Sequence, residues 1–134
     1  MRLTSSVTRI LDADIIIDVQ RRHPPALLWY TQLVPGEVAM AGPALLELYQ
    51  DAKNARQIRE VDILVAPHPV VWPGDAEASR AASLFRSLHL SHGIGLVDML
   101  NAATALTHAL PLCTFNVKHY RLVPALVTEQ PYAR

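Results

Sequence analysis

Apolar and polar residues form two alternating patterns along the chain. Short runs of β-branched and aliphatic residues, bounded by proline, glycine or acidic residues, indicate buried strands. Between them lie longer segments in which apolar residues recur every three or four positions, as in amphipathic helices. The expected strands cover residues 7–11, 37–40, 70–72, 112–115 and 126–128.

Prolines, glycines and acidic residues mark the expected helix starts. Asp14 and Asp75 are expected as helix caps, and prolines in the first turn favour two further starts. The long helix that begins at Asp75 is expected to end before a loop at residues 90–95. The expected helices begin near residues 15, 24, 42, 54, 75 and 96, and a short helical piece follows residue 116.

Strands that alternate with helices predict a parallel sheet covered on both faces. A length of 134 residues is typical of one domain with its own core. We therefore expect residues 1–134 to form a single domain of the three-layer α/β/α class, with a central, mostly parallel sheet of about five strands.

Composition narrows the class of protein further. With 51% hydrophobic and 18% charged residues the chain lacks the signature of disorder, and its formal net charge is zero. Neutrality gives no global attraction to nucleic acid but leaves room for a local basic patch. The single cysteine, Cys113, cannot form an internal disulfide, and no signal peptide or membrane-spanning run is recognisable. We expect a soluble cytoplasmic protein.

Acidic residues follow the first expected strand and open two of the helices. Asp12 and Asp14 come directly after the first strand, while Glu47 and Asp98 lie near helix starts in the apolar contexts ALLEL and LVDML. The carboxyl ends of parallel strands meet at one edge of a sheet, so these acids are expected to converge there. Each acid alone also has a purely structural interpretation, as a helix cap or as a partner of the helix dipole.

Several carboxylates at one apolar edge would repel one another unless a cation were bound. Oxygen ligands favour Mg²⁺ or Mn²⁺, whereas zinc prefers His or Cys, and the only close histidine pair, His89 and His92, lacks a third ligand. An oxygen-only site with Mg²⁺ points to phosphoryl chemistry.

Three segments resemble the motifs of PIN-domain nucleases. ILDADIIID is similar to the family's opening strand and its acidic end, and GPALLELYQ is similar to the helix that carries one Glu. GLVDMLNAATALTHALPLCTFNVKHY resembles the most specific segment, in which an Asp opens an Ala-rich helix and a strand ends in Thr-x-Asn or Thr-x-Asp. The resemblance extends from about Ile10 to Pro124, and the size of the chain resembles that of VapC-type toxins of toxin–antitoxin pairs.

The resemblance implies a Mg²⁺- or Mn²⁺-dependent endoribonuclease that is inhibited by a small antitoxin and commonly forms a homodimer. Asp12, Glu47 and Asp98 match the acidic metal-binding triad, and Thr114 and Asn116 match the fourth motif. Asn116 stands where some members have a carboxylate, which leaves a second metal in doubt.

Basic and aromatic residues are candidates for contacts with RNA and with protein partners. The candidate RNA contacts, which can equally be a solvated helix face, are Arg21, Arg22, Lys118 and Arg121. Trp29, Tyr30 and Trp72 are of the type enriched at interfaces, and equally of the type found in cores. Within ILDADIIID, Asp14 is expected to be a supporting residue or helix cap, and Asp18 to face solvent.

Two other functions fit parts of the pattern. Asp12-Ala13-Asp14 also resembles the first motif of haloacid-dehalogenase-like phosphatases, but only Glu129 follows Lys118 as an acid, whereas that family needs a late acidic motif. A degenerate PIN domain that acts only as a binding module is the other alternative. Retention of all three triad acids disfavours it, because without a metal they would only repel one another.

Overall fold

Five parallel strands form the centre of the molecule. The computed structural model describes residue 3 and residues 6–134. Their strands lie in the order β3-β2-β1-β4-β5, and every pairing is parallel. The strands are β1 (Arg9–Leu11), β2 (Val38–Ala41), β3 (Val70–Val71), β4 (Leu112–Cys113) and β5 (Thr128–Glu129). The α/β class and the five-stranded parallel sheet are as predicted.

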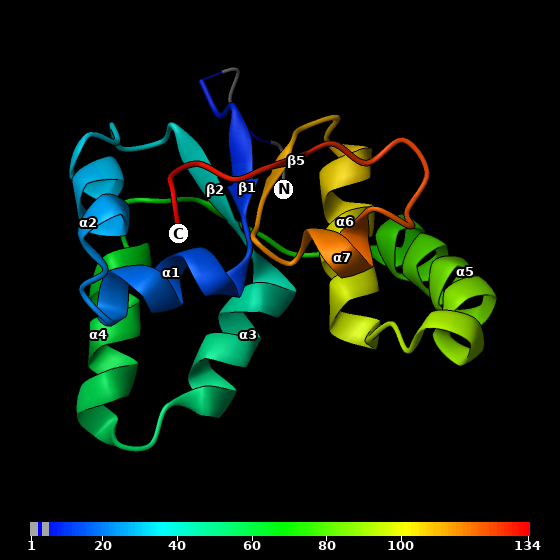
Figure 1. Cartoon of the computed structure of the whole chain (residues 1–134), viewed down its shortest axis with the longest axis horizontal. Coiled ribbons are helices and arrows are strands. Elements are labelled where there is room, and N and C mark those ends of the chain that lie inside the picture. Colours follow the sequence, from blue (N-terminus) through cyan, green and yellow to red (C-terminus); the bar gives the residue numbers. More distant parts are fainter. Residues whose placement is uncertain (1–2, 4–5) are drawn as a thin grey trace.

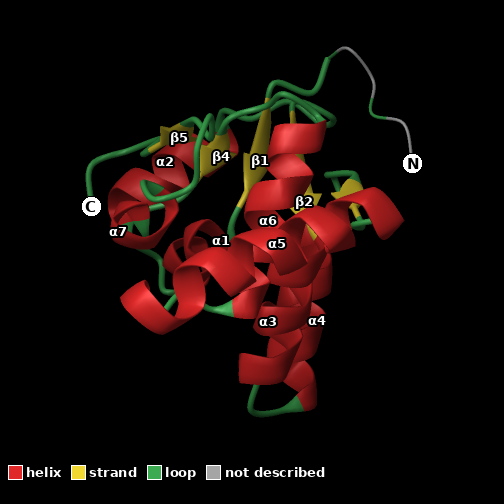
Figure 2. Ribbon diagram, turned by 90° about the vertical axis from the view of Figure 1, so that its right-hand side faces the viewer, coloured by secondary structure: helices red, strands yellow, loops and turns green. Residues whose placement is uncertain are grey.

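Helices connect the strands and cover both sides of the sheet. Figure 1 shows α1 and α2 to one side, α5 and α6 paired on the other, and α3 and α4 extending beyond the sheet. The helices are α1 (Ala13–Gln20), α2 (Pro24–Thr31), α3 (Gly42–Asp51), α4 (Ala55–Val65), α5 (Asp75–His92), α6 (Leu96–Thr107) and α7 (Val117–Tyr120). Figure 2 shows α3 and α4 side by side below the strands. Among the described residues, no helix combines the length and apolar character that crossing a membrane requires.

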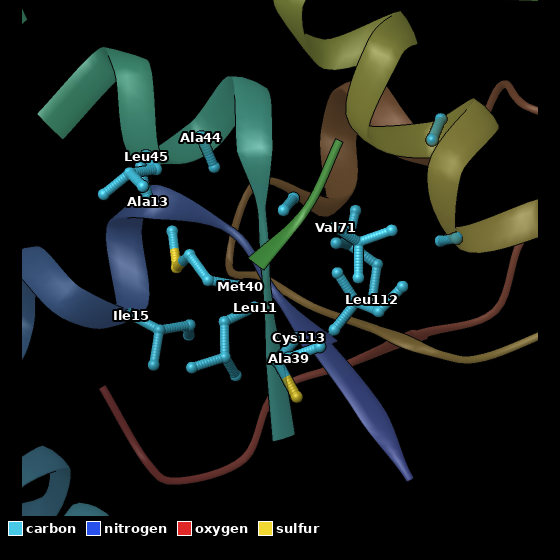
Figure 3. Packing of buried hydrophobic residues seen from close by; sticks show 14 of the residues in the cluster. Leu11, Ala13, Ile15, Ala39, Met40, Ala44, Leu45, Val71, Leu112 and Cys113 are labelled. Carbon is cyan, nitrogen blue, oxygen red and sulfur yellow. The ribbon is translucent and has the colours of Figure 1, made fainter. Parts of the chain in front are cut away.

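The three central strands are buried except at Arg9, the first residue of β1, as a sheet with two covered faces requires. Ile10 on β1 pairs with Ala39 on β2 and with Leu112 on β4, and all three are inaccessible to solvent. Figure 3 shows the aliphatic side chains of these strands packed with residues of the adjoining helices. This register aligns the carboxyl ends of β1, β2 and β4 at one edge.

Three helix boundaries differ from the prediction. Asp12, not Asp14, caps α1, because its Oδ1 accepts a hydrogen bond of 2.7 Å from the backbone nitrogen of Ala13. Helix α5 continues to His92, through part of the expected loop, and ends at Gly93, whose φ of 65° suits glycine. Its N-cap is Gly74, and Asp75 is already helical.

Gly42, the first residue of α3, lies against the indole of Trp72. A Cβ at position 42 would come within 2.4 Å of the Trp72 ring, a distance that no real contact allows. We expect Gly42→Ala to lower the free energy of unfolding by about 1–3 kcal/mol, the range for an overpacked site. Urea denaturation measures it, and Gly42→Ala combined with Trp72→Ala should destabilise less than the two single changes added together. Strict additivity would contradict the proposed clash.

Candidate active site

Asp12 lies at the carboxyl end of β1, where the chain turns into α1. Its side chain is buried, and its Oδ2 accepts a hydrogen bond of 3.0 Å from Thr114 Oγ1. Burial, followed by the neighbouring charge of Asp14, raises the pKa of Asp12 to about 7. A carboxylate in this position is therefore held at a substantial free-energy cost when it is charged.

Asp14 lies beside Asp12 on the first turn of α1 and faces the end of β4. Its Oδ2 accepts a hydrogen bond of 2.7 Å from the backbone nitrogen of Phe115, and Thr114 Oγ1 lies 3.4 Å from the same oxygen. Its other oxygen, Oδ1, is buried without a hydrogen-bond partner among the described residues. Burial raises the pKa of Asp14 as well.

Asp98 enters the site from the first turn of α6. Tyr120 donates a hydrogen bond of 3.3 Å to its Oδ1, and His119 Nδ1 lies 3.2 Å from its Oδ2. The amide of Asn116 lies 3.2 Å from the same histidine nitrogen. Asn101, one turn after Asp98, places its amide nitrogen 3.4 Å from both Asp12 Oδ1 and the Tyr120 hydroxyl. Polar contacts therefore link the ends of β1 and β4 to α6 and α7.

Glu47 comes from the middle of α3 and is half-buried. Burial raises its pKa, and the charges of Asp98, Asp51 and Asp14 raise it further. The pKa of Glu47 therefore responds to the charges of Asp98 and Asp14. Hydrogen bonds connect Asp12, Asp14 and Asp98 with the groups around the ends of β1 and β4, whereas Glu47 is connected with these acids only through the effect of their charges on its pKa.

The arrangement of these acids fits a hydrated divalent cation. Burial raises the pKa of Asp12 and Glu47, neighbouring carboxylates raise it further, and Asp14 Oδ1 is buried without a partner among the described residues; a bound cation would favour the charged form of each acid. Within the part of the chain described, no three His, Cys, Asp or Glu side chains approach closely enough to form a ready-made cage. Mg²⁺ typically keeps several of its waters and takes few protein ligands directly, so an open site is what it requires.

Thr114, the residue directly after β4, holds the side chains of Asp12 and Asp14 in place. It is fully buried, and its hydroxyl accepts a hydrogen bond of 3.0 Å from the backbone nitrogen of Asn116 while contacting both aspartates. We expect Thr114→Val to lower the free energy of unfolding by about 1–3 kcal/mol, because Asp12 Oδ2 and the backbone N–H of Asn116 would lose their hydrogen-bond partner. Thr114→Ser keeps the hydroxyl and should retain most of the stability. Equal urea midpoints for wild type and Thr114→Val would exclude this role.

Within the described part of the chain, the candidate RNA-contacting residues make no hydrogen bond or ion pair with the carboxylate cluster, which comprises Asp12, Asp14, Glu47 and Asp98. All four side chains, those of Arg21, Arg22, Lys118 and Arg121, are exposed. Arg21 lines a cavity of about 450 Å³ between α1, α3 and α4, whose lining includes none of Asp12, Asp14, Glu47 and Asp98. Their role in RNA binding stays a prediction. Of the three aromatics, Trp29 and Tyr30 pack against the core, while Trp72 is 51% exposed.

The prediction for Asp18 was wrong. Its side chain is buried, and it accepts hydrogen bonds from Tyr132 (2.8 Å) and from Arg134 (3.1 Å). These partners arrive from a distant segment of the chain, so local periodicity could not reveal them. Sequence reasoning also missed Asn101, Tyr120 and His119. A signal existed for Asn101, a polar residue one turn after Asp98 in an otherwise apolar helix.

The order of the strands and the acids at their carboxyl edge define a recognisable class of protein. The profile of the PIN domain matches residues 9–123, and the chain belongs to the PIN-domain family. The matched residues include every strand and helix from β1 to α7.

More specific similarities lie within that family. The chain is 32% identical over 126 residues to Ribonuclease VapC10 of Mycobacterium tuberculosis. The aligned region covers 92% of this chain and 92% of that protein. Among solved structures, it is similar to VapBC-1 from nontypeable Haemophilus influenzae (TM-score 0.74, 22% identity, 93% of this chain and 98% of the other). It is also similar to DNA-bound VapBC from Salmonella typhimurium (TM-score 0.77, 19% identity, 92% and 97%). At these identities the structural likeness establishes the shared fold.

Proposed function

We propose that the chain is a Mg²⁺- or Mn²⁺-dependent endoribonuclease and the toxin component of a type II toxin–antitoxin pair. The observation that supports the proposal is the placement of Asp12 at the carboxyl end of β1 and its polar link to Asp98 through Asn101 and Tyr120. Glu47 joins them in the proposal through its match to the acidic triad of the family. Its similarity to a protein named as a ribonuclease supplies the substrate class.

Asp12, Glu47 and Asp98 are the residues that would hold the ion. When bound, Mg²⁺ or Mn²⁺ neutralises charge on the scissile phosphate and lowers the pKa of the attacking water. Asp14 supports the site from beside Asp12, where its unpartnered Oδ1 can accept a hydrogen bond from a water molecule.

The protein's own groups orient the reactants of a phosphodiester hydrolysis. Glu47, less buried than Asp12, is the carboxylate available to orient the attacking water. Thr114 fixes Asp12 and Asp14 through its hydroxyl, and Asn116 presents an uncharged amide toward the same space. Water adds to phosphorus, one phosphorus–oxygen bond breaks, and the departing oxygen takes up a proton.

Asn116 distinguishes this site from one with four carboxylates. Its amide contributes no charge, which lowers the attraction for a second ion. We expect Asn116→Asp to increase the affinity for Mn²⁺ by about tenfold, the effect of one added charge worth about 1.4 kcal/mol. Isothermal titration calorimetry at constant ionic strength measures this, with Asn54→Asp, at the exposed N-cap of α4, as the matched control. An unchanged affinity in Asn116→Asp would place residue 116 outside the ion's reach.

The partners and location follow from the same similarity. One solved structure with this fold is a toxin–antitoxin complex from Klebsiella pneumoniae, which supports a small antitoxin as the protein partner of this chain. A homodimer and a cytoplasmic location complete the proposal, since both suit a regulated ribonuclease. Co-expression with a short neighbouring reading frame should relieve any toxicity that the chain causes alone.

A direct assay tests the activity. The purified protein is incubated with single-stranded RNA and, separately, with a phosphomonoester, in Mg²⁺ and in EDTA. We expect RNA cleavage in Mg²⁺ only and no turnover of the phosphomonoester. Phosphomonoester turnover without RNA cleavage would favour the phosphatase alternative, and RNA binding without either reaction would favour a degenerate binding module.

A further inference from the structure

The segment from residue 130 to residue 134 returns from β5 across the sheet to α1. Figure 1 shows this stretch, in red, ending above α1 and near α2. Tyr132 packs its ring against those of Phe115, Trp29 and His23, and the carbonyl of Ala133 lies 3.2 Å from His23 Nε2. These contacts fix the backbone that carries Arg134.

The guanidinium of Arg134 is held on two sides. One terminal nitrogen donates to Asp18 Oδ1 at 3.1 Å, and the guanidinium carbon lies 5.0 Å from the centre of the Phe115 ring. The carboxylate it contacts is 8% exposed, whereas the Arg134 side chain is 44% exposed. Arg134 is therefore oriented by the buried Asp18 and the half-buried Phe115, while much of its surface stays open to solvent.

Arg134 also lies close to the carboxylate cluster. Asp14 and Asp18 are four residues apart on α1, so both lie on one face of that helix, about one turn from each other. Phe115, whose ring packs against the Arg134 guanidinium, donates a hydrogen bond from its backbone N–H to Asp14.

We propose that Arg134 binds a phosphate group of single-stranded RNA beside the carboxylate cluster and thereby positions the strand for cleavage. The inference rests on the proposed ribonuclease function and adds a residue that the sequence pattern did not single out. A guanidinium presents five N–H donors in a planar fork, and Asp18 uses one of its nitrogens. The others can bind phosphate oxygens, a geometry that arginine provides better than lysine.

Pre-organisation separates Arg134 from the other exposed basic residues near the strand ends. Within the described part of the chain, the side chains of Arg21, Arg22, Lys118 and Arg121 make no hydrogen bond or ion pair, so ordering them on RNA would cost conformational entropy. The side chain of Arg134 is already restricted by its contacts with Asp18 and Phe115 before RNA binds. An acidic site also needs a fixed cation to bring a polyanion close, and Arg134 lies at its border.

The test measures RNA binding apart from cleavage. Fluorescence anisotropy of a labelled single-stranded RNA is recorded over a series of salt concentrations. Ca²⁺, which also takes oxygen ligands, replaces Mg²⁺ so that binding is measured apart from cleavage. We expect Arg134→Ala to weaken binding about tenfold and to lower the salt slope by about 0.7, the value for one phosphate contact on a single strand. Arg134→Lys should restore the salt slope and part of the affinity.

Tyr132→Phe is the matched control, because it removes the other hydrogen bond to Asp18 but keeps the cation. It should lower the melting temperature and leave the salt slope unchanged. An unchanged slope in Arg134→Ala, an equal loss of RNA affinity in Tyr132→Phe, or no RNA binding by the wild type would each overturn the proposal. Arg134-dependent RNA binding by a wild-type protein that cleaves no RNA would refute the ribonuclease function and leave the phosphate contact standing.

Discussion

Asp12→Asn is expected to slow RNA cleavage about a thousandfold. The change removes the charge of the most buried acid at the site, and the loss corresponds to several kcal/mol of transition-state stabilisation by a correctly held ion. Asparagine has nearly the same shape and still offers Oδ1 to the Ala13 N–H, so α1 keeps its cap. Initial rates on a labelled RNA at saturating Mg²⁺ measure the effect.

Asp75→Asn serves as the control, since Asp75 is an exposed residue in the first turn of α5. It should cleave RNA at the wild-type rate. Cleavage by Asp12→Asn within a few-fold of wild type would show that the buried carboxylate takes no part in the reaction.

The same residue should govern the pH dependence of stability in the metal-free protein. Asp12 has a pKa of about 7 when folded and an ordinary value near 4 when unfolded. Because the folded state binds the proton more tightly, stability is complete below pH 4 and is lost as the pH rises toward and through 7. We expect a loss of about 2–4 kcal/mol across this window, with Asp14, whose pKa is also raised, acting in the same direction.

Other groups titrate over the same range, so the informative quantity is the difference between wild type and Asp12→Asn. In EDTA, urea denaturation at pH 5 and pH 8 should show the variant gaining stability relative to wild type at the higher pH. Millimolar Mg²⁺ should stabilise the wild type more than the variant at pH 8, since an ion bound only to the folded state adds to its stability. A difference that stays constant with pH would contradict a raised pKa at Asp12.

The fold could be predicted because each strand and helix has a local signature. Ile10 and Leu11, which point to opposite faces of the strand before Asp12, are both apolar, as in a strand buried on both sides, and this strand forms the centre of the sheet. Boundaries were less accurate, because they depend on single hydrogen bonds. Asp12 and Asp14 are equally suitable caps by residue type, and only the bond from Ala13 to Asp12 decides between them.

The position of Asp12 at the carboxyl edge of the sheet could be predicted for a different reason. Acids in apolar contexts at strand ends have few stable explanations, and topology alone brings those ends together. The supporting groups could not be predicted from the local pattern. Asp18 looks like an ordinary exposed helix residue until Tyr132 and Arg134 reach it from more than a hundred positions away. Tyr120 is likewise defined by its contacts with Asp98 and Asn101.

The central claim is that the carboxyl edge of the sheet binds a divalent cation through Asp12, Glu47 and Asp98. Titration of metal-free protein with Mn²⁺, followed by electron paramagnetic resonance at pH 7.5, measures that binding without any substrate. We predict saturable binding by the wild type that is at least about tenfold weaker in Asp98→Asn and unchanged in Asp75→Asn. Absence of saturable Mn²⁺ binding, or equal affinity in wild type and Asp98→Asn, would contradict the claim.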